Sequence, residues 1–279
     1  MQAVVGGMPA TAPRIMRTML VLVCAMGLLA ATSGQALAKK HKPKKPTITT
    51  HTPVTKGSTY LALGDSVTFG YEEAQVVPAP NRFDASSFLG YPELLGSELH
   101  LKVVNASCPG ETSSSLIDAT AQSNGCENTA VPGGQIYRAM WPLHVSYSES
   151  QLAFAVGYLK KHHNVRLVSV MIGANDFFVC QETTADHCAS LTEQAAVVAT
   201  VGNSVKATLS QIRNKAHYRD QLAIVNYYSL DYSSTAQITS TKLLNATVDN
   251  AAEPFHVEVA DEFGELEAGA QAGGAALAG

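Results

Sequence analysis

Short apolar runs alternate with segments of helical spacing along most of the chain. The apolar runs predict five buried strands, at 59–63, 101–105, 165–172, 222–228 and 255–260. Apolar residues three or four positions apart predict helices between them, most clearly at 91–99, 151–163, 191–216 and 242–252. Strands that alternate with helices favour a parallel sheet covered on both faces. We therefore expect an α/β protein, a three-layer α/β/α sandwich with a parallel five-stranded sheet.

Two stretches depart from this regular pattern. Residues 71–90 contain Pro, Asn and Phe without periodicity, and residues 114–150 have few periodic positions but several turn signals, including Asn124-Gly125. Long segments without repeating structure in a compact domain are usually functional or disordered. We expect both to be surface excursions, the second pinned by Cys126.

Three predicted strands are followed by glycine and polar residues of the kinds found in catalytic and binding sites. Gly64-Asp65-Ser66 follows the first strand, a loop containing Gly110 follows the second, and Gly173-Ala174-Asn175-Asp176 follows the third. Each alone has an ordinary explanation, because Gly, Asp, Asn and Ser are common turn residues. The carboxyl ends of parallel strands meet at one edge of a sheet, where such folds bind ligands. Ser66, Gly110 and Asn175 together therefore indicate a site at this edge.

On these three ordered blocks, residues 59–264 resemble the SGNH hydrolases, also called GDSL lipases and esterases, in their secreted, disulfide-containing branch. The resemblance implies a flavodoxin-like fold and hydrolysis of carboxylic esters of lipids or acylated carbohydrates, without a cofactor. It implies that Ser66 is the nucleophile. The oxyanion hole would then consist of the N–H groups of Ser66 and Gly110 and the side-chain amide of Asn175. The chain has no Gly-x-Ser-x-Gly sequence, which disfavours the α/β-hydrolase fold.

One element of the resemblance is missing. The family has an Asp-x-x-His after the fifth strand, whose histidine is the general base, whereas no histidine follows His256 here. Loss of a triad member typically costs several orders of magnitude in rate. The explanation that we favour is a chain truncated at its C-terminus. The alternatives are a substitute base, for which His144 and His187 lie in suitable loops, and a non-catalytic protein that binds acyl or glycosyl ligands.

A phosphate-binding loop at 110–113 is a weaker interpretation of the second block. Glu111 would repel phosphate, and no lysine follows in the loop.

The N-terminal region has a composition of its own. Arg14 and Arg17 precede an apolar run at 19–31 and a small-residue cleavage site at 36–38, which predicts a secretory signal peptide at 1–38; a retained membrane anchor is the less favoured alternative. Residues 39–58 are rich in Lys, Pro and Thr and predict a linker. The remaining chain, 59–279, is expected to form one hydrolase-like domain, C-terminally incomplete.

Charge divides the chain in the same way. Residues 1–58 hold 8 of the 19 Lys and Arg residues and no acidic residue, so the predicted domain carries 11 basic and 23 acidic residues. An acidic domain disfavours nucleic acid as a partner. The lysines within Lys39–Lys45 either contact an anionic cell envelope or form a solvated spacer. We expect a secreted monomer that acts on a small ester.

Four cysteines remain beyond the predicted signal peptide: Cys108, Cys126, Cys180 and Cys188. In an exported protein they are expected to pair. Of the three pairings we favour the local one, Cys108 with Cys126 and Cys180 with Cys188, because each pair flanks a polar loop. A zinc site formed with His187 is disfavoured by the absence of a Cys-x-x-Cys spacing.

Overall fold

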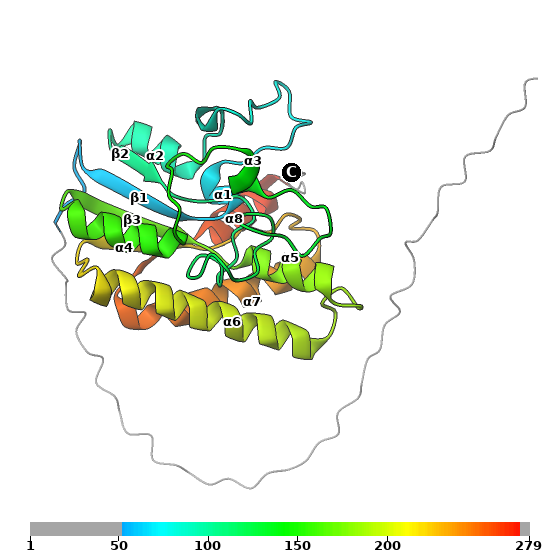
Figure 1. Ribbon diagram of the computed structural model, residues 1–279. Coiled ribbons are helices and arrows are strands. Elements are labelled where there is room, and N and C mark those ends of the chain that lie inside the picture. Colours follow the sequence, from blue (N-terminus) through cyan, green and yellow to red (C-terminus); the bar gives the residue numbers. More distant parts are fainter. Residues whose placement is uncertain (1–51, 274–279) are drawn as a thin grey trace, which may run out of the picture. The chain divides into compact units, whose positions relative to one another are not determined.

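A computed structural model describes residues 52–273, so the predicted signal peptide and the Lys39–Lys45 segment lie outside the described residues. Five strands form one sheet in the order β2-β1-β3-β4-β5, and all four neighbouring pairs are parallel (Figure 1). The strands are β1 Thr59–Gly64, β2 Lys102–Asn105, β3 Val165–Met171, β4 Gln221–Val225 and β5 Glu258–Ala260. The predicted parallel five-stranded α/β architecture is confirmed.

Helices occupy most of the segments between the strands. The α-helices are α1 Ser66–Phe69, α2 Tyr91–Glu98, α3 Tyr137–Met140, α4 Gln151–Lys161, α5 Ala174–Thr183, α6 Leu191–Ser210, α7 Thr235–Ala252 and α8 Glu262–Gly273. Short 3₁₀ turns lie at η1 Ala85–Ser87 and η3 Glu253–Phe255, and a π-helical turn, η2 Gln211–Lys215, ends the long helix α6. As predicted, the segment 114–150 is mainly irregular, α3 being its one short helix among the described residues.

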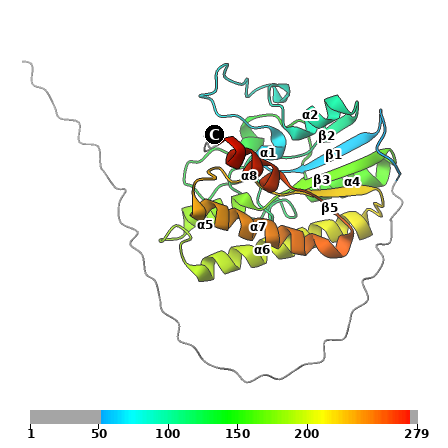
Figure 2. The ribbon, with the colours of Figure 1, turned by 180° about the vertical axis from the view of Figure 1, so that it is seen from behind.

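Alternating residues of β1 point to two apolar clusters on opposite faces of the sheet. Leu61 and Leu63 join the larger cluster, which includes buried residues of α4, α6 and α7. Tyr60 and Ala62 join a smaller cluster with residues of β3 and partners from α2. Figures 1 and 2 show α6 and α7 on the side of the sheet opposite α2. The result is a three-layer sandwich whose main core lies on the α6 and α7 side.

Three elements differ from the sequence-based expectation. Helix α5 begins inside the Gly173-Ala174-Asn175-Asp176 segment, where the sequence predicted no helix. Helix α8 forms where the Gly- and Ala-rich sequence has little apolar periodicity. The fifth strand starts at Glu258 because Glu253–Phe255 is a 3₁₀ turn and His256 has the left-handed φ of 52°. Small and polar residues carry little helical periodicity, so the sequence did not predict α5 and α8, which tertiary contacts support.

Candidate active site

The first site segment is the junction between β1 and α1. Gly64 ends the strand with φ of +154°, and a Cβ there would lie 2.3 Å from Thr68 Oγ1 and 2.5 Å from the Met171 carbonyl oxygen. Asp65 caps α1 by accepting a hydrogen bond from the Val67 N–H at 3.0 Å. Ser66 is therefore the first residue of the helix and is only partly buried. The sharp turn needs glycine, and it presents Ser66 at the carboxyl edge of the sheet.

The second site segment is the loop that follows β2. The Cys108 N–H donates to the Gly64 carbonyl at 3.1 Å, which places this loop beside the serine segment. Gly110 has φ of +82°, and a Cβ there would lie 2.3 Å from the Asn124 carbonyl oxygen, so only glycine fits. Within residues 52–273 neither the Ser66 N–H nor the Gly110 N–H has a hydrogen-bond acceptor. Two free backbone donors thus lie on adjoining segments.

The third site residue, Asn175, lies in the first turn of α5 and is 5% exposed. Its Oδ1 accepts a hydrogen bond from Asn124 Nδ2 at 2.9 Å, and its Nδ2 donates to Asp65 Oδ2 at 3.3 Å. These two contacts fix which end of the amide is the donor. One of the two Nδ2 protons has no acceptor among the described residues, so it is available to a ligand.

A buried acid stands next to each of the three site residues. Asp65 precedes Ser66, Glu111 follows Gly110, and Asp176 follows Asn175; they are 1%, 0% and 9% exposed. Asp65 and Asp176 each contact another segment of the site directly, and Glu111 contacts helix α4. Asp65 accepts from Asn175, as above. Asp176 accepts from the N–H and the hydroxyl of Ser113 at 2.8 Å and 2.6 Å. Glu111 accepts from Gln151 Nε2 at 2.9 Å. The three segments are therefore joined to one another by hydrogen bonds to buried carboxyl groups.

Burial also shifts the pKa of these acids upward. Burial raises the pKa of Asp65 from 3.8 to about 6, against the lowering effect of its hydrogen bond from Tyr227. Burial likewise raises the pKa of Asp176 to about 6, opposed by Ser113. For Glu111, burial and the charge of Glu127 raise the pKa well above its ordinary value. Such shifts are typical of functional sites and also of structural networks, so the geometry must decide between them.

Tyr227, just beyond β4, adds a further buried contact. Its hydroxyl donates to Asp65 Oδ2, and Asn245 of α7 holds its backbone by accepting from the N–H at 2.9 Å and donating to the carbonyl at 2.7 Å. Asp65 is thus held from the segments that follow β3 and β4.

No histidine among the described residues is bonded to Ser66. His144 packs its ring against Phe69 of α1, with ring centroids 4.4 Å apart, and its Nε2 lies 3.0 Å from the Phe69 carbonyl oxygen. The other loop candidate, His187, has Nδ1 at 3.0 Å from the Gln181 carbonyl oxygen. Three residues after Asp261, where an Asp-x-x-His would have its histidine, stands Gly264, whose N–H donates to Asp261 at 3.0 Å. His144 reaches the serine helix, but at its end rather than at Ser66.

The structure joins Cys108 to Cys126 and Cys180 to Cys188, the local pairing that we favoured. Two groups of possible metal ligands occur among residues 52–273, Cys108 with Glu111 and Cys126, and Cys180 with Cys188 and Glu193. In both groups the sulfur atoms are part of a disulfide, so they are not thiolate ligands.

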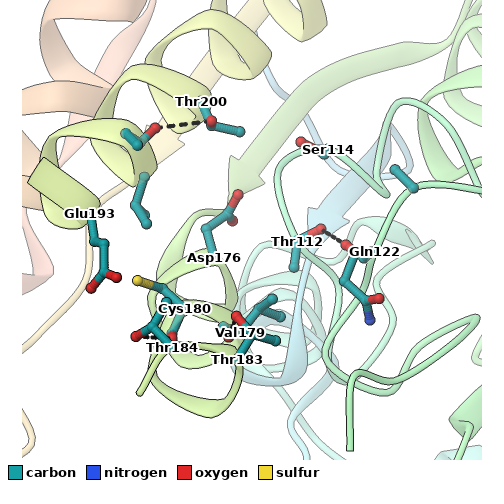
Figure 3. A pocket seen from close by; sticks show the side chains of 13 residues that line it. Thr112, Ser114, Gln122, Asp176, Val179, Cys180, Thr183, Thr184, Glu193 and Thr200 are labelled. Carbon is teal, nitrogen blue, oxygen red and sulfur yellow. Dashed lines mark hydrogen bonds between the residues drawn. The ribbon is translucent and has the colours of Figure 1, made fainter. Parts of the chain in front are cut away.

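A cavity of about 500 Å³ is lined in part by residues that follow the second and third site segments, including Thr112, Ser114 and Asp176. Figure 3 shows Thr112, Ser114 and Gln122 of the irregular loop on one side and residues of α5 and α6 on the other, with Asp176 between them. Its size suits a small ligand. Ser66 does not line it, so the cavity is separate from the nucleophile position while sharing the walls that carry Gly110 and Asn175.

Several residues of this network escaped the sequence analysis. Asn124 was interpreted as part of a turn, Tyr227 as strand, and Gln151 as the start of an amphipathic helix. Only their position beside strand ends or a disulfide hints at the site. Their partners are remote in sequence, and no local pattern reports such contacts.

The parallel α/β fold and a strand-end serine beside free backbone donors are features expected of a hydrolase. Residues 62–277 match the model of the GDSL-like lipase/acylhydrolase family, and the chain belongs to that family. No curated protein matches the sequence.

Solved structures include similar chains at low sequence identity. A putative GDSL-like lipase from Parabacteroides merdae is 17% identical with a TM-score of 0.47, over 79% of this chain and 84% of that one. Axe2, an acetylxylan esterase from Geobacillus stearothermophilus, is 18% identical with a TM-score of 0.44, over 78% of this chain and 81% of that one.

Proposed function

We propose that this member of the family hydrolyses carboxylic esters through Ser66, with an oxyanion hole formed by the N–H groups of Ser66 and Gly110 and by Asn175 Nδ2. The observation that carries the proposal is a set of three hydrogen-bond donors that have no acceptor among residues 52–273: the Ser66 N–H, the Gly110 N–H and one proton of Asn175 Nδ2. The three segments that carry these donors are joined to one another by hydrogen bonds. Preorganised donors of this kind stabilise the charge that develops on a carbonyl oxygen.

The chemistry has two steps. Ser66 Oγ gives its proton to water or to an added base such as imidazole and attacks the ester carbonyl carbon, and the oxyanion forms against the three donors. Collapse of the intermediate breaks the bond to the alkoxide, which takes up a proton from the same base or from water and leaves as the alcohol. Water then hydrolyses the acyl-serine and releases the acid. Each oxyanion donor contributes roughly 10²–10³-fold to turnover in enzymes of this type.

Proton removal is the weak step in this chain. Ser66 Oγ has no hydrogen-bond partner among the described residues, and His144 is bonded to the Phe69 carbonyl instead. A serine without a base is a weak nucleophile. We therefore propose slow turnover that an added base accelerates.

Imidazole supplies a direct test. Cleavage of nitrophenyl acetate by the full chain is measured against imidazole concentration, beside Ser66→Ala and an enzyme-free blank. The expected result is a Ser66-dependent rate that rises and saturates with imidazole. Equal rates for the wild type and Ser66→Ala at every imidazole concentration contradict the proposal.

The unbonded Ser66 hydroxyl also favours one alternative, a degenerate member that binds acyl or glycosyl ligands without turnover. It predicts that short-chain acids or acetylated sugars raise the melting temperature while imidazole produces no Ser66-dependent hydrolysis. Appearance of an acyl-Ser66 adduct by mass spectrometry contradicts this alternative.

The proposal extends to the substrate, the acting form and the location of the protein. We propose a small ester of a lipid or an acylated carbohydrate as the substrate and a monomer as the acting form. The two disulfides suit an oxidising, extracellular location. Among residues 52–273 no helix is long and apolar enough to cross a membrane. The domain division 1–38, 39–58 and 59–279 remains part of this proposal, as does envelope contact through Lys39–Lys45.

A further inference from the structure

A fully buried glutamine begins helix α4. Gln151 follows the N-cap Ser150 and is 0% exposed, although the first turn of a helix usually carries its polar side chains toward water. Burying a carboxamide costs free energy unless its hydrogen bonds are made. A buried Gln151 is therefore expected to have all of its hydrogen-bonding groups satisfied.

Gln151 pairs with the backbone of Gly64 at two points. Its Oε1 accepts from the Gly64 N–H at 2.6 Å, and its Nε2 donates to the Gly64 carbonyl at 3.0 Å. The ladder between β1 and β2 ends with the pair Ala62 and Asn105. Gly64 lies beyond that pair. Its carbonyl accepts from the Cys108 N–H at 3.1 Å, and the Gln151 amide supplies a second donor to that carbonyl and the acceptor for the Gly64 N–H.

The same amide also reaches the second site segment. Nε2 donates its other proton to Glu111 Oε2 at 2.9 Å, and Glu111 Oε1 accepts from the Ser115 hydroxyl. All three hydrogen-bonding groups of the carboxamide are thus used. One side chain connects the residue two positions before Ser66 with the residue directly after Gly110.

We infer that Gln151 is a positioning residue for the oxyanion hole: it sets the spacing between the Ser66 and Gly110 N–H groups without touching the substrate. This inference rests on the proposed function. Misplacement of a catalytic group by about 1 Å can cost roughly 10²-fold in rate. A merely structural role, in which Gln151 only anchors α4, predicts a loss of stability and no specific loss of rate.

Two variants separate these roles. Gln151→Ala removes all three hydrogen bonds, whereas Gln151→Glu keeps the shape and replaces the Nε2 donor by an oxygen. Val205→Ala is the control, because Val205 is buried at 1% exposure in α6 and lies outside the hydrogen-bonded site. All three are compared at a temperature where each is fully folded.

Kinetics at saturating imidazole provide the first measurement. We expect Gln151→Ala to lower kcat about 10²-fold with KM changed by less than about 2-fold, and Val205→Ala to keep kcat. The Gln151→Glu rate is expected to recover partly as the pH is lowered, since a protonated carboxyl group donates again. Glu111 and Tyr147 lie beside this position, and Glu127 and Arg138 act on Glu111, so these groups contribute to that titration. Equal kcat values for Gln151→Ala and Val205→Ala overturn the inference.

Amide hydrogen exchange provides a second measurement that needs no turnover. Gln151→Ala is expected to accelerate exchange at the Gly64 N–H, whereas Val205→Ala leaves it protected. Unchanged protection of Gly64 in Gln151→Ala overturns the junction itself. Wild-type rates equal to those of Ser66→Ala overturn the proposed function and the catalytic part of the inference, and the exchange data then still decide whether the junction exists.

Discussion

The two halves of the sheet's carboxyl edge are held very differently. After β1, β2 and β3, the segments with Ser66, Gly110 and Asn175 are joined by buried acids, by amides and by the Cys108–Cys126 disulfide. All six residues of β1 are buried, whereas all three residues of β5 are exposed. The segment after β5 is held by Asn226, which donates to Asp261 at 2.9 Å and accepts from the Phe263 N–H at 3.1 Å.

This difference separates the two tasks of a serine hydrolase. Oxyanion stabilisation needs rigid donors, and the segments after β1, β2 and β3 provide a connected network for the proposed ones. Proton transfer needs a base beside the serine, and the residues described at the β5 end supply none. The structure therefore combines a connected network around the proposed oxyanion site with a proposed nucleophile that has no base beside it among the described residues, which is why the proposed activity is slow.

Two asparagines at strand ends test this comparison with the largest expected effect. Asn175→Ala removes a proposed oxyanion donor and is expected to lower the Ser66-dependent rate roughly 10²–10³-fold. Asn226→Ala removes an amide of the same size after β4 and is expected to change that rate by less than about 5-fold. The rates are measured with nitrophenyl acetate at saturating imidazole. Equal losses in the two variants would place the rigid donors elsewhere.

The two disulfides make a second pair. Replacing both cysteines of Cys108–Cys126, separated by 18 positions, is expected to cost about 3 kcal/mol of unfolding free energy, and replacing both of Cys180–Cys188, separated by 8, about 2.5 kcal/mol. Chemical denaturation of the two double Cys→Ser variants measures these costs. Only loss of the first disulfide is expected to lower the rate as well, because it closes the loop that carries Gly110. A rate loss confined to the second variant would contradict this assignment.

The buried acids predict an unusual dependence of stability on pH. Folding raises the pKa of Asp65 and of Asp176 from 3.8 to about 6, so between about pH 4 and pH 6 the folded state binds more protons than the unfolded state. Their contribution to stability is therefore fully present below pH 4 and is lost as the pH rises through 6. Each carboxyl group is expected to account for about 3 kcal/mol of this change.

Asp65→Asn tests that expectation. The asparagine does not titrate, so the decline in unfolding free energy between pH 4 and pH 7 is expected to become smaller by the share of Asp65. Denaturation curves at several pH values measure the slope, with exposed Asp84→Asn as the matched control. An unchanged slope in Asp65→Asn would show that Asp65 is not the titrating group.

The fold was predicted well because each strand and helix has a periodic pattern within its own short stretch of sequence. The buried strand 165–172 and the helix from Gln151 are strong periodic patterns, and β1 through β4 were placed close to their observed bounds. Ser66, Gly110 and Asn175 were identified because each directly follows a strand, and the order of strands brings strand ends together. Their catalytic roles remain proposals.

The supporting network was not predictable in the same way. Gln151 lies 87 positions from Gly64, and Tyr227 lies 162 positions from Asp65. A buried hydrogen bond between such residues leaves no periodic signal, since it depends on the angle at which a helix meets a strand end. Helix α8 was not predicted for a related reason: Phe263 is the one buried residue of the helix up to residue 271, and its Gly, Ala and Glu neighbours show little apolar periodicity.

The attachment of α8 provides the test with the smallest expected effect. Lys242 of α7 lies 3.2 Å from Glu267 Oε1 of α8 and 5.0 Å from the centre of the Phe263 ring, but its side chain is 54% exposed. Exposed ion pairs typically contribute less than about 1 kcal/mol, because water screens them and two long side chains must be ordered. Lys242→Ala is expected to lower the unfolding free energy by about 0.5 kcal/mol, and less in high salt. The Ser66-dependent rate of ester cleavage should not change, since no described contact links this pair to Ser66, Gly110 or Asn175. A large rate loss in Lys242→Ala would mean that the β5 end is coupled to the site more tightly than its few contacts indicate.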